Sequence, residues 1–108
     1  MTTDRVILVA SLYIHPGREA EFEEFETAAA DIMRRYGGAI DRRIGIGPGD
    51  ASNLPYEVHV VSFPDDRSFQ EYRADVDLQA LADLRSRAIR ETVVWFGTEL
   101  PGFGIPTA

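Results

Sequence analysis

Few side chains in this sequence can exchange a proton near neutral pH, and His59 is the best placed of them. It lies in the apolar run Tyr56–Phe63, where strand alternation puts it on one face with Glu57, Val61 and Phe63. An imidazole in the middle of a buried strand can act as a general acid or base. The simpler interpretation is a core or dimer-interface histidine with one satisfied hydrogen bond.

Arginines are the candidates for binding a polar group of a ligand. Arg43 follows Asp41 and Arg42 in a short polar strand, and a same-face Asp41/Arg43 pair could orient an acidic or enolic ligand. Solvated charges on an edge strand are the alternative. Arg85 interrupts an otherwise apolar helix face, so it could bind a ligand carboxylate or form an ion pair between subunits.

Two aromatic residues, Tyr13 and Trp95, are candidates for lining a pocket between sheet and helices. Each combines a flat stacking surface with one hydrogen-bonding atom. Aromatic residues of an ordinary core give the same pattern. The glutamates of the segment Glu19–Glu26 are interpreted as the solvated face of a helix.

No metal ion or organic cofactor is expected. His15, a turn residue beside Pro16, is far from His59 in the sequence, and no H-x-x-x-H or H-E-x-x-H spacing exists. The glycines of Gly45–Gly49 have neither the G-x-G-x-x-G register nor the lysine of a phosphate loop. The chain contains no cysteine, which excludes thiolate metal sites and thiol nucleophiles.

The segments that must position these residues follow from hydrophobic periodicity. Strands are predicted over Val6–Ile14, Ala39–Ile46, Tyr56–Phe63 and Thr92–Phe96, and the clearest helix over Arg18–Tyr36, ended by Gly37 and Gly38. Asp65 or Asp66 is a natural N-cap for a helix that carries Phe69 and Tyr72. A second start signal at Asp77 fits two short helices or one broken helix.

The resulting order is β-α-β-β-α-β, so the predicted fold is α+β and ferredoxin-like, in one domain over residues 1–108. That topology places the helices on one face of a four-stranded antiparallel sheet and leaves the other face bare. The bare face is too apolar for water, so we expect a homodimer in which two sheets pack face to face. The tail Pro101–Ala108 is expected to lie over a neighbouring segment or the partner chain.

Composition narrows the choice of partners. The chain has 108 residues, 44% of them hydrophobic, and a net charge of −7, which disfavours binding to nucleic acid. The start of the sequence lacks the pattern of a signal peptide, and the apolar run Val6–Ile14 is too short to span a bilayer. The expected partners are a second copy and a small molecule, in the cytoplasm, with no membrane contact.

The segment Phe63–Tyr72, read FPDDRSFQEY, continues through Asp77–Leu81 to Leu84 and Arg85. It resembles the dimeric α/β-barrel superfamily, and most closely the domain-of-unknown-function family 1330, in which a Phe-Pro strand end precedes an amphipathic helix and an arginine. The resemblance implies the fold and a dimer. For activity it implies only a range: cofactor-independent monooxygenases, haem-degrading enzymes, muconolactone isomerase-like enzymes and stress-responsive proteins.

Three hypotheses follow. The first is a homodimer that binds a small apolar or aromatic molecule between sheet and helices, with Tyr13, Arg43, Arg85 and Trp95 as ligand-binding residues. The second is an enzyme of the cofactor-independent monooxygenase or isomerase type with His59 as acid/base. The third is a structural or interaction dimer that has no ligand.

Overall fold

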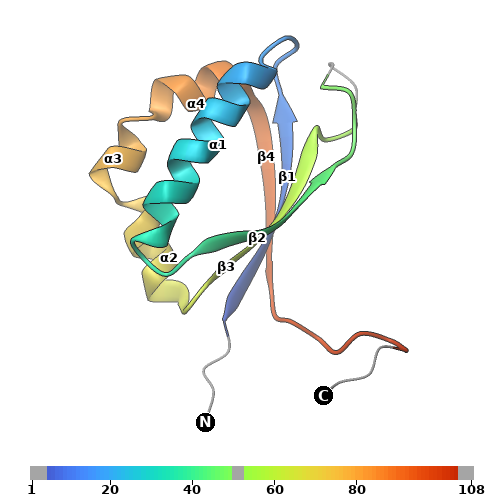
Figure 1. Cartoon of the computed structure of the whole chain (residues 1–108), viewed down its shortest axis with the longest axis vertical. Coiled ribbons are helices and arrows are strands. Elements are labelled where there is room, and N and C mark those ends of the chain that lie inside the picture. The colour runs from blue at the N-terminus through green and yellow to red at the C-terminus, as the bar shows by residue number, and fades with distance from the viewer. Residues whose placement is uncertain (1–4, 50–52, 105–108) are drawn as a thin grey trace.

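The computed structural model describes residues 5–49 and 53–104. In chain order its elements are β1 (Val6–Ile14), α1 (Glu19–Arg34), β2 (Ala39–Gly45), β3 (Glu57–Phe63), α2 (Asp66–Arg73), α3 (Val76–Gln79), α4 (Ala82–Ala88) and β4 (Ile89–Gly97). The strands form a four-stranded antiparallel sheet in the order β2-β3-β1-β4. The helices cover one face of this sheet, so the predicted ferredoxin-like arrangement is confirmed (Figure 1).

Helix α1 forms because its apolar side chains recur at three- and four-residue intervals and are buried together against the sheet. The buried members are Phe22, Phe25, Ala29, Ile32 and Met33. The helix ends near Gly37, whose φ of +73° only glycine adopts without strain. A Cβ at this position would also come within 2.7 Å of the Pro64 ring. Gly37 therefore both ends α1 and allows close contact with the end of β3.

The second helical region contains three short helices where the sequence suggested two helices or a broken one. Asp65 caps α2 as predicted, since its carboxylate accepts a hydrogen bond of 2.8 Å from the Ser68 amide. The prediction of a helix start at Asp77 is wrong, because Asp75 caps α3 by accepting from the amides of Asp77 and Leu78. Tyr36 donates a hydrogen bond to the same Asp75 carboxylate, a long-range contact that a local pattern does not contain.

The hydrophobic core lies between the helices and the face of the sheet toward them, which we call the inner face. Two clusters form it. One is centred on Leu12, Ile14, Phe22, Phe25, Ala29, Leu84, Ala88 and Ile89, and the other on Leu8, Met33, Val61, Phe63 and Phe69. Ile89 belongs to this core and starts β4, which is why the last strand begins before the predicted Thr92.

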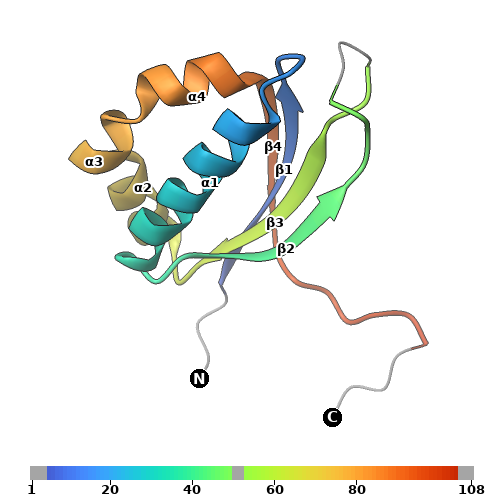
Figure 2. The same cartoon turned by 45° about the horizontal axis from the view of Figure 1, so that its top comes forward.

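The opposite face of the sheet, the outer face, carries no helix (Figure 2). The strand register places Ile7, Val9, Tyr13, Ile44, Val58, Val60, Val93 and Trp95 on it. Beyond β4, the chain up to residue 104 runs away from the sheet and the helices (Figure 1). It does not lie over another segment of its own chain, and the predicted tail beyond 104 falls outside the described residues. None of the helices in residues 5–49 and 53–104 has the length and apolar content to cross a membrane.

Candidate functional site

A cavity of about 500 Å³ lies between the inner face of the sheet and the helices. Its apolar walls include Leu8, Leu12, Phe25, Val61, Phe63 and Phe69. This volume falls in the range of roughly 300–1,000 Å³ that is usual for small-molecule sites. The cavity is therefore large enough for a ligand of one to three rings.

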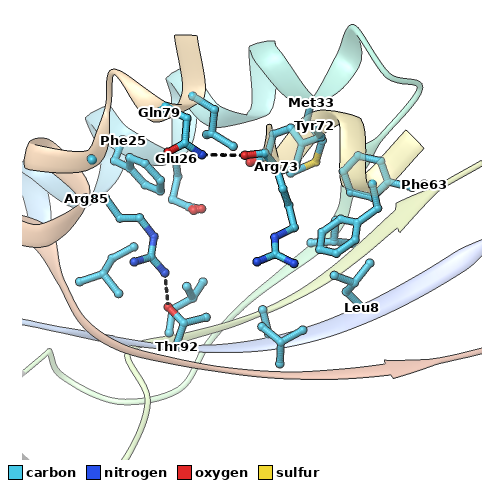
Figure 3. Close-up of a pocket in the computed structure, with 18 residues that line it drawn as sticks. Leu8, Phe25, Glu26, Met33, Phe63, Tyr72, Arg73, Gln79, Arg85 and Thr92 are labelled. Carbon is cyan, nitrogen blue, oxygen red and sulfur yellow. Dashed lines mark hydrogen bonds between the residues drawn. The ribbon is translucent and has the colours of Figure 1, made fainter. Parts of the chain in front are cut away.

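Polar groups enter this cavity from the helices and from β4 (Figure 3). Glu26 comes from α1, Arg73 from the end of α2 and Arg85 from α4. The Arg85 guanidinium donates a hydrogen bond of 3.0 Å to the Thr92 hydroxyl. The Arg73 guanidinium lies 5.7 Å from the centroid of the Phe69 ring, a cation–π distance. Apolar walls with a few convergent polar groups are typical of a binding site.

Glu26 is the acidic group of the cavity, and its side chain is only 16% exposed. Burial, with the nearby charge of Glu57 as the next cause, raises the pKa of Glu26 to about 7. The interpretation of the α1 glutamates as a solvated face is thus wrong for this residue. Near neutral pH Glu26 is present in both protonation states, which is the condition for a general acid or base.

His59 lies behind Glu26 and does not line the cavity. It is on the inner face together with Glu57, Val61 and Phe63, the residues with which strand alternation grouped it, and it is only 2% exposed. Its Nε2 is 2.8 Å from the Glu57 carboxylate, and its Nδ1 is 3.9 Å from Glu26. The ring of Phe22 packs against it, with the centroids 6.1 Å apart. His59 can therefore reach a ligand only through Glu26.

Arg43 is the last member of a row of ionisable side chains that runs from the inner face of the sheet to α1. Its guanidinium makes two hydrogen bonds of 2.7 Å to Glu57 and a third to Glu23. Burial alone would raise the pKa of Glu57, but the hydrogen bonds from Arg43 and His59 outweigh it and lower this pKa. The result is a continuous sequence of groups, Arg43–Glu57–His59–Glu26, from the edge of the sheet to the cavity.

The predicted same-face pair of Asp41 and Arg43 is wrong. A β-bulge interrupts β2 between Ile40 and Arg42, so Asp41 has no partner on β3 while Arg43 pairs with His59. Strict alternation would have put Arg43 on the outer face. Asp41 is exposed, as the edge-strand alternative expected, and Arg43 is held by carboxylates.

Tyr13 and Trp95 do not line the cavity, and the prediction that they do is wrong. Trp95 pairs with Val9 and is 57% exposed on the outer face. Tyr13 lies on the same face, with the Arg90 guanidinium 5.2 Å from its ring centroid. Of the residues predicted to bind a ligand, Arg85 alone lines the cavity.

Sequence reasoning missed three groups of the site: Glu26, Glu57 and Arg73. A signal for Glu26 was present, because it is four residues after Phe22 and three before Ala29, on the buried stripe of α1. Arg73 gave no such signal, since its position depends on where α2 ends. Over residues 5–49 and 53–104, no three histidine or acidic side chains come together in a way that could hold a metal ion.

No family model and no curated protein matches the chain. Solved structures are similar to it. A protein of unknown function from Rhodopseudomonas palustris has a TM-score of 0.77 at 13% identity, with 93% of this chain and 85% of that chain covered. SnoaB, a cofactor-independent oxygenase from Streptomyces nogalater, has a TM-score of 0.69 at 18% identity, with 94% and 99% covered.

A protein from Bordetella bronchiseptica, provisionally assigned as an antibiotic biosynthesis monooxygenase, has a TM-score of 0.68 at 20% identity, over 91% of this chain and 99% of that one. Similarity at these identities shows the fold, which is shared by uncharacterised and monooxygenase-like proteins. The resemblance to family 1330 in particular has no matching family model.

Proposed function

We propose that the protein is a homodimer that binds one small apolar or aromatic molecule per protomer, in the cavity between sheet and helices. The cavity of about 500 Å³ is the observation that carries this proposal. Protein interiors are packed as densely as organic crystals, so a space of this size beneath four helices needs an occupant or a reason to stay open. Its aromatic walls suit the faces and edges of a ring.

Binding can be tested with N-phenyl-1-naphthylamine, an uncharged aromatic probe whose fluorescence rises in apolar sites. We expect saturable binding to the wild type. Ala82→Trp, which places an indole among the lining residues without a change of charge, should weaken binding at least about tenfold. Ala74→Trp is the matched control, because Ala74 is exposed and does not line the cavity. No binding to the wild type, or equal binding to Ala82→Trp, would contradict the proposal.

The outer face supports the dimer. It carries a contiguous apolar surface with Val9, Val58 and Val60 at its centre, and monomeric proteins rarely expose such a surface to water. We expect a dimer by light scattering at micromolar concentration. Val60→Asp, which places a charge in the middle of this face, should give a folded monomer. If the wild type is a monomer under these conditions, the proposal of a dimer is wrong. The cavity proposal is tested separately by probe binding.

A second candidate is an enzyme of the cofactor-independent monooxygenase or isomerase type, with proton abstraction from the bound molecule as the first step. The row of ionisable groups Arg43–Glu57–His59–Glu26, which ends at the cavity, favours this second candidate. His59 was the predicted acid/base, but it is buried behind Glu26. In this candidate, Glu26 is therefore the group that contacts the substrate. The carboxylate would take the proton, and the Arg85 guanidinium would stabilise the oxyanion that forms.

Proton abstraction can be measured without knowledge of the substrate by following hydrogen–deuterium exchange of 2-tetralone, an enolisable aromatic ketone, by NMR in D₂O. We expect the protein to accelerate exchange and Glu26→Gln to lose about 10²-fold or more of that acceleration. Glu24→Gln, on the exposed side of the same helix, should retain it. Exchange at the buffer rate in the presence of the wild type would exclude this candidate and leave ligand binding intact.

A further inference from the structure

We infer that the ligand of this cavity is an aromatic carboxylate, with its ring against the apolar walls and its carboxylate between the guanidinium groups of Arg73 and Arg85. This inference rests on the proposed function and specifies its ligand class. It depends on charge, on geometry and on the state of Glu26.

The cavity is locally basic in an acidic protein. The whole chain has a net charge of −7, yet the charged side chains among the lining residues are two arginines and one glutamate. Among residues 5–49 and 53–104, neither Arg73 nor Arg85 has an acidic side chain within ion-pair distance. Arginine stays protonated in proteins, so both guanidinium groups are cations that have no carboxylate partner in the described part of the chain. An anionic ligand would supply that partner.

The two guanidinium groups approach the same space from different helices. Figure 3 shows Arg85 and Arg73 extending into the cavity on either side of its centre, with the Glu26 carboxyl group between the helices above them. Thr92 accepts one of the hydrogen bonds of Arg85, which fixes this side chain and leaves its other N–H groups free to bind a ligand. The planar fork of a guanidinium matches the two oxygens of a carboxylate.

Glu26 makes this preference dependent on pH. The charged and titratable groups around it are Glu23 on α1, Arg43 on β2, Glu57 and His59 on β3, Tyr72 on α2 and Arg85 on α4. With its pKa raised to about 7, Glu26 is mostly neutral at pH 6 and does not repel an anion. At pH 8 it is mostly ionised, and its charge then competes with the ligand for Arg85. Affinity for a carboxylate should therefore fall as pH rises through 7.

The inference can be tested with 2-naphthoate and the uncharged 2-naphthamide, which have the same ring system and nearly the same shape. By isothermal titration calorimetry at pH 6, we expect 2-naphthoate to bind at least about tenfold more tightly. Arg85→Gln and Arg73→Gln should each remove most of this preference, because they weaken the binding of 2-naphthoate far more than that of 2-naphthamide. Arg87→Gln, the same change on the same helix away from the cavity, should have no effect.

The pH arm uses Glu26→Gln, which should bind 2-naphthoate equally at pH 6 and pH 8, whereas the wild type should bind it several-fold more weakly at pH 8. Equal affinity of the wild type for the two probes, or a preference that survives both arginine substitutions, would overturn the ligand class. The cavity proposal would then still stand on the 2-naphthamide data. If neither probe bound, the proposed function itself would fail.

Discussion

The two faces of the sheet depart from the usual distribution of side chains in opposite ways. The inner face, covered by helices, holds Glu57 and His59 at 7% and 2% exposure. The outer face exposes valines, a tyrosine and Trp95. Buried charges are retained only when they are paired, and exposed apolar surface marks an interaction site. This difference between the faces is the basis of the two proposals, ligand binding beside the inner face and contact with a second copy through the outer face.

The largest effect on stability should come from a change in the core packing around Glu57 and His59. Phe22 is fully buried and contacts both Tyr56 and His59. Phe22→Ala should lower the free energy of unfolding by about 3–5 kcal/mol, measured by urea denaturation. Trp95→Ala on the outer face, at a protein concentration low enough to dissociate a dimer, should cost less than about 1 kcal/mol. A similar loss of stability for the two substitutions would contradict the difference between the faces.

Next in size is the effect of pH through Glu26. The pKa of this carboxyl is about 7 in the folded chain and near 4.5 in the unfolded chain, so between these values the folded state binds the extra proton. Stability should then fall as pH rises from 4.5 to 7, by an amount of about 3 kcal/mol. Glu26→Gln should abolish this fall and exceed the wild type in stability at pH 8. Parallel stability curves for the two proteins would contradict the raised pKa.

Glu57 should make stability depend on pH in the opposite direction. Its pKa lies below the ordinary value of 4.5, so its contribution is complete above that pH and is lost as pH falls through the lower folded-state value. Glu57→Gln should destabilise the protein by about 2 kcal/mol at pH 7, because Arg43 and His59 lose a charged partner. Glu23→Gln, which removes an exposed partner of the same Arg43, should cost less than about 1 kcal/mol. An equal cost for both would show that burial of Glu57 has no energetic consequence.

The smallest effect comes from neighbouring valines that point to opposite faces. Val61 is buried on the inner face, whereas Val60 is half-buried on the outer one. Val61→Ala should cost about 1.5 kcal/mol at any protein concentration. Val60→Ala should cost less than about 1 kcal/mol in the monomer and show a cost that grows with concentration if the outer face is an interface. A concentration-independent effect of Val60→Ala would argue against contact through this face.

The fold was predictable because it depends on local patterns. The stripe of Phe22, Phe25 and Met33, the cap at Asp65 and the left-handed Gly37 each act over a few residues. These signals suffice to order the elements, and the order gives the topology.

The site was only partly predictable, because its groups meet through contacts between distant segments. Alternation grouped His59 with Glu57, Val61 and Phe63, but which face this is and how close His59 comes to Glu26 depend on how α1 crosses β3. Tyr13 and Trp95 were assigned to the cavity although alternation alone does not say which face the helices cover. Aromatic character indicated burial, and the structure shows instead that these rings belong to the outer face.

The bulge at Asp41 has a consequence for how this site can change in evolution or in design. Because Asp41 is left out of the ladder, Arg43 and not Ile44 lies on the same face as Glu57. Deleting Asp41 would remove the bulge and leave Arg43 opposite His59, whereas a regular ladder that kept Asp41 would place Arg42 opposite His59 and turn Arg43 to the outer face. In related chains, alternation along β2 therefore gives the face of each side chain only where it is known whether the bulge is present. A one-residue gap at Asp41 in an alignment would mark loss of the bulge, with Arg43 kept beside Glu57 and His59.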